Sequence, residues 1–212
     1  MVGPGVLREC LLDPDVGRVL SIGRSSTGTV HPKLREIVHT DLFDYGEVES
    51  ELHGFDACFF CLGVSAAGMS EQDYRHITFD LTLSAANTLV RLNPAMMFIY
   101  VSGTGTHANG RMMWARVKGA TENALLALPF RAAYMFRPGY IQPLHGIKTK
   151  TRWYGALYAV MAPLYPLWRT IFPNYVTTTE NVGRAMLVAA KRGAPSKILE
   201  SADINQLAQT KS

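Results

Sequence analysis

The sequence has few cysteines and few charged residues. Three cysteines in 212 residues are too few for a disulfide scaffold, and their odd number favours a reducing compartment. Charged residues make up 18% and apolar residues 48%, a balance that excludes an intrinsically disordered chain. Arg8 and Glu9 interrupt any early apolar run, so no secretory signal peptide is visible. We expect a cytoplasmic protein with a single domain over residues 1–212.

The sequence also has no apolar run long enough for a membrane-spanning helix. Residues 153–168 are uncharged, but Pro163 and Pro166 interrupt them, and a spanning helix needs about 20 apolar residues. Basic residues flank this aromatic stretch, which lies within a subregion spanning 140–180. We favour an apolar substrate pocket or a homodimer face here, and peripheral contact with an anionic membrane is the alternative.

No metal or disulfide-exchange site is expected. The sequence contains no HExxH motif. Cys58 and Cys61 form a CxxC pair, but they lie in an apolar run that reads as a strand. Residues i and i+3 of a strand point to opposite faces, so these thiols should diverge into the core.

Charge is distributed unevenly along the chain. Residues 1–110 carry 7 basic and 13 acidic residues, whereas residues 111–192 carry 12 basic and 2 acidic residues. The basic part could face a phosphate, another anionic ligand or a membrane, and a solvated basic surface explains it equally well. We expect no nucleic-acid partner.

Strand-like and helix-like segments alternate along the chain. Strands are predicted at 18–23, 36–41, 56–63, 96–102, 130–137, near 175 and at 197–199; helices are predicted at 1–12, 47–52, 70–92, 111–128 and 180–191. This order with short connections is typical of an α/β fold, a Rossmann-like doubly wound parallel sheet with helices on both faces. In such folds a strand and a glycine-rich turn precede the first helix. Here the helix and the last glycine of the turn are present, so we expect the first strand and the earlier glycines to be missing.

Six stretches resemble an atypical branch of the short-chain dehydrogenase/reductase superfamily, the NmrA-like and Tat-interacting-protein-like proteins of the NAD-dependent epimerase/dehydratase family. They read MVGPGVLREC, VLSIGRS, DACFFCLGVS, FIYVSGTGT, WARVKGATENAL and FRPGYIQP. In that family the first turn reads Gly-x-x-Gly-x-x-Gly, and Met1-Val2-Gly3 matches only its end. The resemblance implies a strand and two glycines upstream of Met1, and weak dinucleotide binding without them.

The resemblance also implies an NAD(P) site. Arg24 occupies the position where an acid would hold the ribose of NAD and an arginine can accept the 2′-phosphate of NADP, so NADP is expected over NAD. The full set of cofactor-binding residues that the resemblance implies is Val2, Gly3, Arg24, Ser25, Asp41, Leu42, Leu62, Gly63, Val64, Lys118, Pro138 and Gly139.

The catalytic residues implied by the resemblance are Ser102, Lys118 and the residue at position 114. In the superfamily a serine polarises the substrate carbonyl, a Tyr-x-x-x-Lys pair supplies a tyrosine general acid, and the lysine lowers the pKa of that tyrosine. Here the pair reads Trp114-Ala-Arg-Val-Lys118, and an indole cannot act as a proton donor near neutral pH.

Two functions therefore remain open. The first is an NAD(P)-binding, atypical reductase-like protein with impaired catalysis, acting on an apolar carbonyl or alcohol; Ser102 and Lys118 favour it. The second is a non-catalytic module that senses NADP and regulates a partner, which Trp114 favours.

Overall fold

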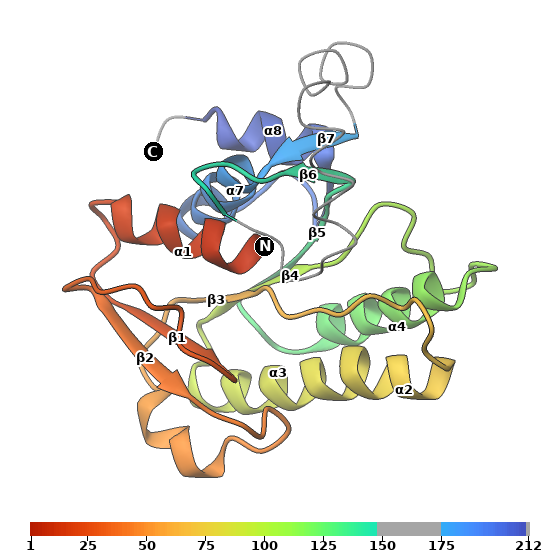
Figure 1. Ribbon diagram of the computed structural model, residues 1–212, viewed down its shortest axis with the longest axis horizontal. Coiled ribbons are helices and arrows are strands. Elements are labelled where there is room, and N and C mark those ends of the chain that lie inside the picture. Colours follow the sequence, from red (N-terminus) through yellow and green to blue (C-terminus); the bar gives the residue numbers. More distant parts are fainter. Residues whose placement is uncertain (148–174, 211–212) are drawn as a thin grey trace.

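The computed structural model describes residues 1–147 and 175–210, and these form an α/β structure (Figure 1). Every strand pair is parallel. In chain order the elements are α1 (Val2–Leu12), β1 (Val19–Gly23), β2 (Leu34–Val38), η1 (Gly46–Glu51), β3 (Ala57–Phe60), α2 (Glu71–Arg75), η2 (His76–Asp80), α3 (Leu81–Leu92), β4 (Met97–Val101), α4 (Met113–Ala127), β5 (Ala132–Arg137), β6 (Tyr140–Gln142), β7 (Val176–Thr178), α7 (Thr179–Arg192), β8 (Ile198–Glu200) and α8 (Ser201–Ala208).

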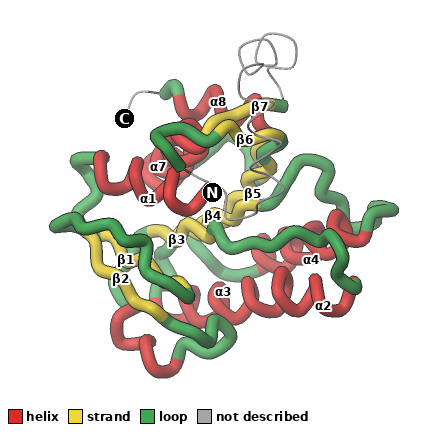
Figure 2. Tube along the Cα trace, viewed as in Figure 1, coloured by secondary structure: helices red, strands yellow, loops and turns green. Residues whose placement is uncertain are grey.

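A four-stranded sheet forms the centre, with strand order β3-β4-β5-β8. Its strands are apolar on both faces, as buried parallel strands must be; Phe98, Ile99 and Phe136 are fully buried. One hydrophobic cluster combines this sheet with residues of α1, α7 and α8, and the other combines it with residues of α3 and α4. Helices therefore cover both faces (Figure 2), which confirms the predicted Rossmann-like architecture.

A separate two-stranded sheet, β1-β2, lies beside the central sheet. Strand β1 pairs only with β2, and β3 pairs only with β4, so no ladder joins β1 to β3 among the described residues. All five residues of β1 are half-buried, whereas four of the five in β4 are buried. The sheet is thus divided between β1 and β3.

The first helix forms as predicted and packs tightly on α7. A Cβ atom at Gly5 would lie 2.7 Å from the Thr179 side chain and 3.0 Å from its carbonyl oxygen, closer than side chains allow. On the same helix the buried Glu9 accepts a hydrogen bond from the Arg184 Nε atom at 3.2 Å. Close glycine packing and this ion pair fix α1 against the central sheet through α7.

Several features differ from the sequence prediction. The helix predicted over 70–92 contains a π-helical turn, η2, between α2 and α3. Strand β6 and helix α8 were not predicted, because β6 has only three residues and α8 follows β8 without a separating turn. Within the described residues no helix is long and apolar enough to cross a membrane. The predicted interface segment 153–168 lies outside the described residues.

The two cysteines of the CxxC pair lie on opposite faces of the sheet, as predicted. Cys58 packs against the cluster formed with α3 and α4, and Cys61 packs against the cluster formed with α1 and α7. Burial raises the pKa of the Cys58 thiol to about 12 and raises that of Cys61 as well. Both thiols are therefore protonated and poorly reactive at neutral pH.

Candidate nucleotide site at the carboxyl edge of the sheet

Most of the residues predicted to bind the dinucleotide follow the carboxyl ends of parallel strands. Arg24 follows β1, Asp41 lies three residues after β2, and Leu62 lies two residues after β3. All three side chains are exposed, as are Ser25 and Gly63. Because the strands are parallel, these loops lie at one edge, where ligands bind in open α/β sheets.

Arg24 is available to an anion. Its side chain is exposed and makes no hydrogen bond or ion pair with the residues that the structure describes. The other predicted residues of this edge have defined roles in the loops. The Asp41 carboxylate accepts a hydrogen bond from the Phe43 backbone N–H at 2.9 Å, and Leu42 is buried. These contacts fix the loop after β2. Neither of them involves the guanidinium of Arg24, which is exposed to solvent.

Apolar side chains of the β3 loop are exposed at the same edge. Leu62 is 39% exposed and Val64 is 37% exposed. The start of α1 lies next to this loop: a Cβ atom at Gly3 would lie 3.6 Å from the Cys61 Cβ atom, and Val2 packs against the same cluster as Cys61. The backbone N–H groups of the first turn of α1 are therefore close to the end of β3, and such groups favour anions.

The backbone of the Pro138-Gly139 turn after β5 makes one hydrogen bond to the main chain and one to a side chain. The Pro138 carbonyl accepts a hydrogen bond from the Thr104 N–H at 3.2 Å, and the Gly139 N–H donates to the Ser201 hydroxyl at 2.9 Å. A Cβ atom at Gly139 would lie 2.5 Å from the Tyr175 carbonyl oxygen, so only glycine fits there without movement. This turn joins the loop after β4 to the start of α8.

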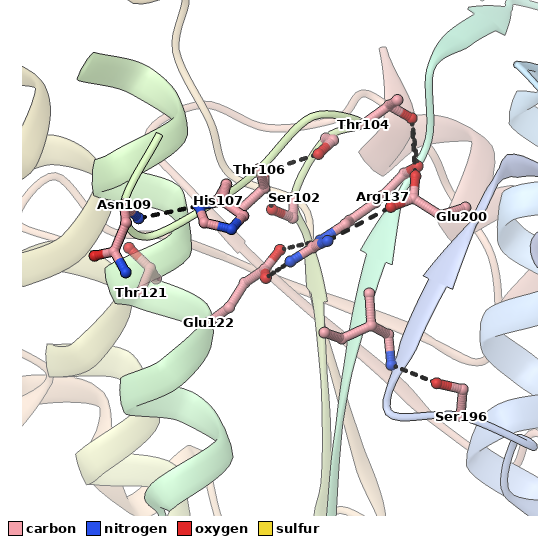
Figure 3. Close-up of polar contacts among 12 residues, drawn as sticks. Ser102, Thr104, Thr106, His107, Asn109, Thr121, Glu122, Arg137, Ser196 and Glu200 are labelled. Atoms are coloured by element: carbon pink, nitrogen blue, oxygen red, sulfur yellow. Dashed lines mark hydrogen bonds and ion pairs between the residues drawn. The ribbon is translucent and has the colours of Figure 1, made fainter. Parts of the chain in front are cut away.

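Ser102 follows β4 and is buried. Its hydroxyl lies 3.0 Å from the Thr106 hydroxyl, and Thr106 in turn donates to the Gly103 carbonyl at 2.7 Å (Figure 3). This small network fixes the Ser102 rotamer at the carboxyl end of β4. A hydroxyl has a single hydrogen. If Thr106 donates its hydrogen to Ser102 in place of Gly103, the Ser102 hydroxyl is free to donate to a substrate carbonyl oxygen.

Lys118 lies on α4 and points toward β4. Its Nζ atom donates to the Val101 carbonyl at 3.4 Å and lies 5.4 Å from the centre of the Tyr100 ring. Burial lowers the pKa of the amine to about 8, and the nearby Glu122 carboxylate opposes this shift. Lys118 therefore remains mostly protonated at pH 7. Its positive charge lies at the carbonyl of Val101, the residue that precedes Ser102.

A buried ion network next to Lys118 was not predicted from the sequence. The Arg137 guanidinium donates to both Glu122 oxygens, at 3.0 and 2.5 Å, and its Nη1 atom lies 3.5 Å from a Glu200 oxygen (Figure 3). Thr104 donates to the other Glu200 oxygen at 3.1 Å. The i, i+4 spacing of Lys118 and Glu122 was visible in the sequence, but the partner on β5 was not.

Trp114 lies one helical turn before Lys118 on α4 and borders a pocket of its own. Its indole borders a shallow pocket of about 320 Å³, whose other lining residues are Ser65, Ala66, Ala67 and Tyr74. Ser102 and Lys118 do not line this pocket. On its other side the indole packs on the loop after β4, 3.4 Å from the position of a Cβ atom at Gly105, which has a φ of +86°. The predicted catalytic roles of Ser102, Trp114 and Lys118 remain predictions.

Solved structures with the same fold include a short-chain dehydrogenase/reductase, a UDP-galactose 4-epimerase and an enzyme in complex with NAD+. An oxidoreductase of the short-chain dehydrogenase/reductase family from Burkholderia thailandensis is 16% identical, with a TM-score of 0.64 over 96% of this chain and 88% of its own. The Bordetella bronchiseptica enzyme WbmF, solved with NAD+, is 13% identical, with a TM-score of 0.62 over 97% of this chain and 73% of its own. The fold is therefore that of the short-chain dehydrogenases/reductases and related epimerases.

Curated relatives include fungal proteins called fmp52, although no family model matches the chain. The Emericella nidulans protein is 29% identical over 66% of this chain and 63% of its own length. The Eremothecium gossypii protein is 26% identical over 98% of this chain and 92% of its own length. The match to the first of these spans less than two thirds of that relative.

These relatives correct the predicted location. Both are named as mitochondrial proteins, as is the Saccharomyces cerevisiae relative, which is 27% identical over 72% of this chain and 65% of its own length. The prediction of a cytoplasmic protein is therefore wrong. It depended on the absence of a visible secretory signal and on the odd cysteine number, and neither distinguishes the cytoplasm from other reducing compartments.

Proposed function

We propose that this protein binds NADP(H) at the carboxyl edge of its parallel sheet and acts as a reductase of an apolar carbonyl compound. The observation that carries the proposal is Arg24, an exposed arginine without a partner in the described chain, at the end of β1. A free guanidinium there complements the 2′-phosphate of NADP by charge-assisted hydrogen bonds, whereas NAD offers only a hydroxyl.

The remaining groups at this edge suit the rest of the cofactor. Exposed Leu62 and Val64 offer apolar contact to the adenosine, and Gly63 between them lets the chain approach closely. The first turn of α1 can receive a phosphate. Lys118 supplies a partly buried positive charge beside Ser102, where the nicotinamide and the substrate carbonyl would meet. The relatives' names favour a mitochondrial location.

A non-catalytic NADP sensor is the second candidate. It is favoured by Trp114, which provides no acidic proton, and by the Lys118 hydrogen bond to a main-chain carbonyl. Both candidates require the cofactor site. They differ in whether reduced cofactor is consumed, and a Lys118→Ala variant separates them: loss of turnover in that variant supports the reductase, and tight NADPH binding without turnover by the unchanged protein supports the sensor.

We also propose that a further parallel strand fits between β1 and β3 and completes the sheet. The division of the sheet supports this, because the edges of β1 and β3 would otherwise expose unpaired N–H and C=O groups beside apolar residues. A strand inserted there would carry its following turn to the start of α1, next to the proposed phosphate position.

Calorimetric titration tests both proposals. NADPH is titrated into the 212-residue chain and into the chain extended by the codons directly upstream of Met1. We expect micromolar binding by the extended chain and at least tenfold weaker binding by the shorter one. Equal affinities, or a stop codon directly upstream, would contradict the additional strand, and absence of binding by both proteins would contradict the cofactor site.

A further inference from the structure

The segment 102–106 after β4 folds into a tight turn. The Thr106 N–H donates to the Gly103 carbonyl at 3.2 Å, which closes a four-residue β-turn. Gly105, the third residue of this turn, has a φ of +86°, a value that glycine adopts without strain and that a type II turn requires at this place. Because the chain reverses here, the Thr106 side chain returns to Ser102, and the two hydroxyls lie 3.0 Å apart (Figure 3).

Both hydroxyls of this contact are shielded from water. Ser102 is 7% exposed and Thr106 is 3% exposed. The Ser102 backbone is fixed as well, since its N–H donates to the Phe136 carbonyl of β5 at 2.7 Å. Within the part of the chain that the structure describes, the Ser102 hydroxyl has one hydrogen-bond partner, the hydroxyl of Thr106. The direction in which Ser102 donates is therefore set by Thr106.

The register of the sheet places Ser102 beside the loop proposed to hold the cofactor. The last residue pair between β3 and β4 is Phe60 with Tyr100. Leu62 and Ser102 each lie two residues beyond this pair, on adjacent parallel strands. Leu62 is 39% exposed at the carboxyl edge. Ser102 therefore lies at the edge where the proposed function places the substrate carbonyl.

Each hydroxyl has a single hydrogen, so the donors of the network can be assigned. Thr106 donates its hydrogen to the Gly103 carbonyl at 2.7 Å, which leaves Ser102 as the donor across the 3.0 Å contact. In this arrangement the Ser102 oxygen can only accept a further hydrogen bond. The arrangement therefore suits an alcohol, whose hydroxyl can donate to Ser102.

The reverse arrangement is also available to the pair. When the Thr106 hydroxyl turns to Ser102, the Ser102 hydrogen is released and can be donated to a carbonyl oxygen. The Gly103 carbonyl keeps its hydrogen bond from the Thr106 N–H at 3.2 Å, so it is not left without a donor. The two arrangements thus differ only in the rotation of two hydroxyls, and neither hydroxyl loses its proton.

We propose that Thr106 is a positioning residue for Ser102 and that the two hydroxyls have opposite hydrogen-bond directions with a bound carbonyl compound and with a bound alcohol. This inference rests on the proposed NADP(H)-dependent reduction. With the carbonyl compound bound, Thr106 donates to Ser102, and Ser102 donates to the carbonyl oxygen. With the alcohol bound, Ser102 accepts from the alcohol and donates to Thr106, which donates to Gly103. Every hydroxyl hydrogen has an acceptor in both states.

Steady-state kinetics on the form of the protein that binds NADPH test the proposal. The substrates are a panel of benzaldehydes and aliphatic aldehydes, and the corresponding alcohols serve as product inhibitors. Thr106→Val removes the hydroxyl and keeps the shape of the side chain. We expect kcat/KM for the aldehyde to fall and the inhibition constant of the alcohol to rise, each by about three- to tenfold, the effect of one lost hydrogen bond.

Thr106→Ser is the conservative variant, because it keeps the hydroxyl. Both kinetic values should stay within about twofold of those of the unchanged protein, and the Kd for NADPH should stay within about twofold in both variants. Thr82→Val is the matched control. Thr82 of α3 is 1% exposed, and its hydroxyl donates to the Thr78 carbonyl at 2.5 Å. Its replacement removes a buried hydroxyl that has no contact with Ser102, so kcat/KM should stay within about twofold.

Four results would overturn the proposal. A fall in kcat/KM of less than about threefold in Thr106→Val, or an equal fall in Thr106→Ser or Thr82→Val, would remove the role of Thr106 and leave the cofactor site and the reductase intact. An unchanged inhibition constant of the alcohol in Thr106→Val would exclude the reversal of the hydrogen-bond direction. Absence of turnover by the unchanged protein on the whole panel, with NADPH still bound, would remove the reductase function and the role of Thr106 with it.

Discussion

Two arginines at the carboxyl ends of parallel strands have opposite environments. Arg137 ends β5 and forms ion pairs with Glu122 and Glu200, and its side chain is 18% exposed. Arg24 follows β1, is exposed, and has no partner in the described chain. The same type of side chain thus serves to hold helix α4 and strand β8 to β5 in one case, and is free to bind an anion in the other.

This difference divides the edge of the sheet into two regions. At β5 and β8 the positive charge is already neutralised by carboxylates, so this region stabilises the fold and has little attraction for a phosphate. At β1 and β3 the positive charge is uncompensated and the neighbouring apolar side chains are exposed. An anionic cofactor is therefore expected over β1 and β3, with its reactive end directed toward Lys118.

Replacement of Arg137 should have the largest effect on stability. Arg137→Leu leaves the Glu122 carboxylate, which is 2% exposed, without its partner. Loss of one member of a buried pair typically costs about 3–5 kcal/mol. The free energy of unfolding in urea measures this loss. The matched variant Arg24→Leu should change it by less than about 0.5 kcal/mol, as surface substitutions usually do; equal losses in both variants would remove the distinction between the two regions.

Replacement of Arg24 should instead reduce cofactor affinity. Arg24→Ala removes charge-assisted hydrogen bonds to the 2′-phosphate, so we expect the Kd for NADPH to rise about 10- to 100-fold. The Kd for NADH, which lacks this phosphate, should change by less than about threefold. Calorimetric titration measures both values on the form of the protein that binds NADPH. A parallel rise in both Kd values would show that Arg24 acts on the structure of the loop.

Lys118 should give the stability a pH dependence. Burial lowers its pKa in the folded state from 10.5 to about 8. Between these values the unfolded state binds more protons, so the contribution of Lys118 to stability rises with pH and is complete near pH 10.5. The free energy of unfolding of the unchanged protein in urea, minus that of Lys118→Met, should therefore rise from pH 7 to pH 10. A constant difference would mean that the amine is not desolvated.

The exposed ion pair between Arg116 of α4 and Glu71 of α2 should contribute least. Arg116 and Glu71 are 36% and 49% exposed, and exposed pairs typically contribute about 0.2–1 kcal/mol. Glu71→Gln should lower the urea stability by this amount or less, and the loss should vanish at 1 M salt because the charges are screened. A loss as large as that of Arg137→Leu would show that the pair organises the two helices.

Periodicity and apolar runs predicted most of the fold. Two-sided apolar runs such as Met97–Val101 can only be buried parallel strands once helices alternate with them. The π-helical turn was not predictable, because an α-helix and a π-helical turn share the same residue preferences. Strand β6 was missed because three residues carry no clear alternation.

The candidate site was only partly predictable. The resemblance grouped Arg24, Asp41 and Leu62 at one cofactor site, and the structure places each of them after the end of a parallel strand. Their role in binding stays a prediction. The pairing of Glu122 with Arg137 depends on how far α4 is shifted along β5, and no local pattern encodes this shift.

Hydrogen–deuterium exchange with and without NADPH tests the central claim most directly. If the cofactor lies over β1 and β3, peptides that contain residues 23–25 and 61–65 should exchange more slowly in its presence, and peptides from β5 and β8 should be unchanged. Protection confined to β5 and β8, or none at the first two segments under conditions where NADPH is bound, would contradict the assignment of the cofactor to this edge.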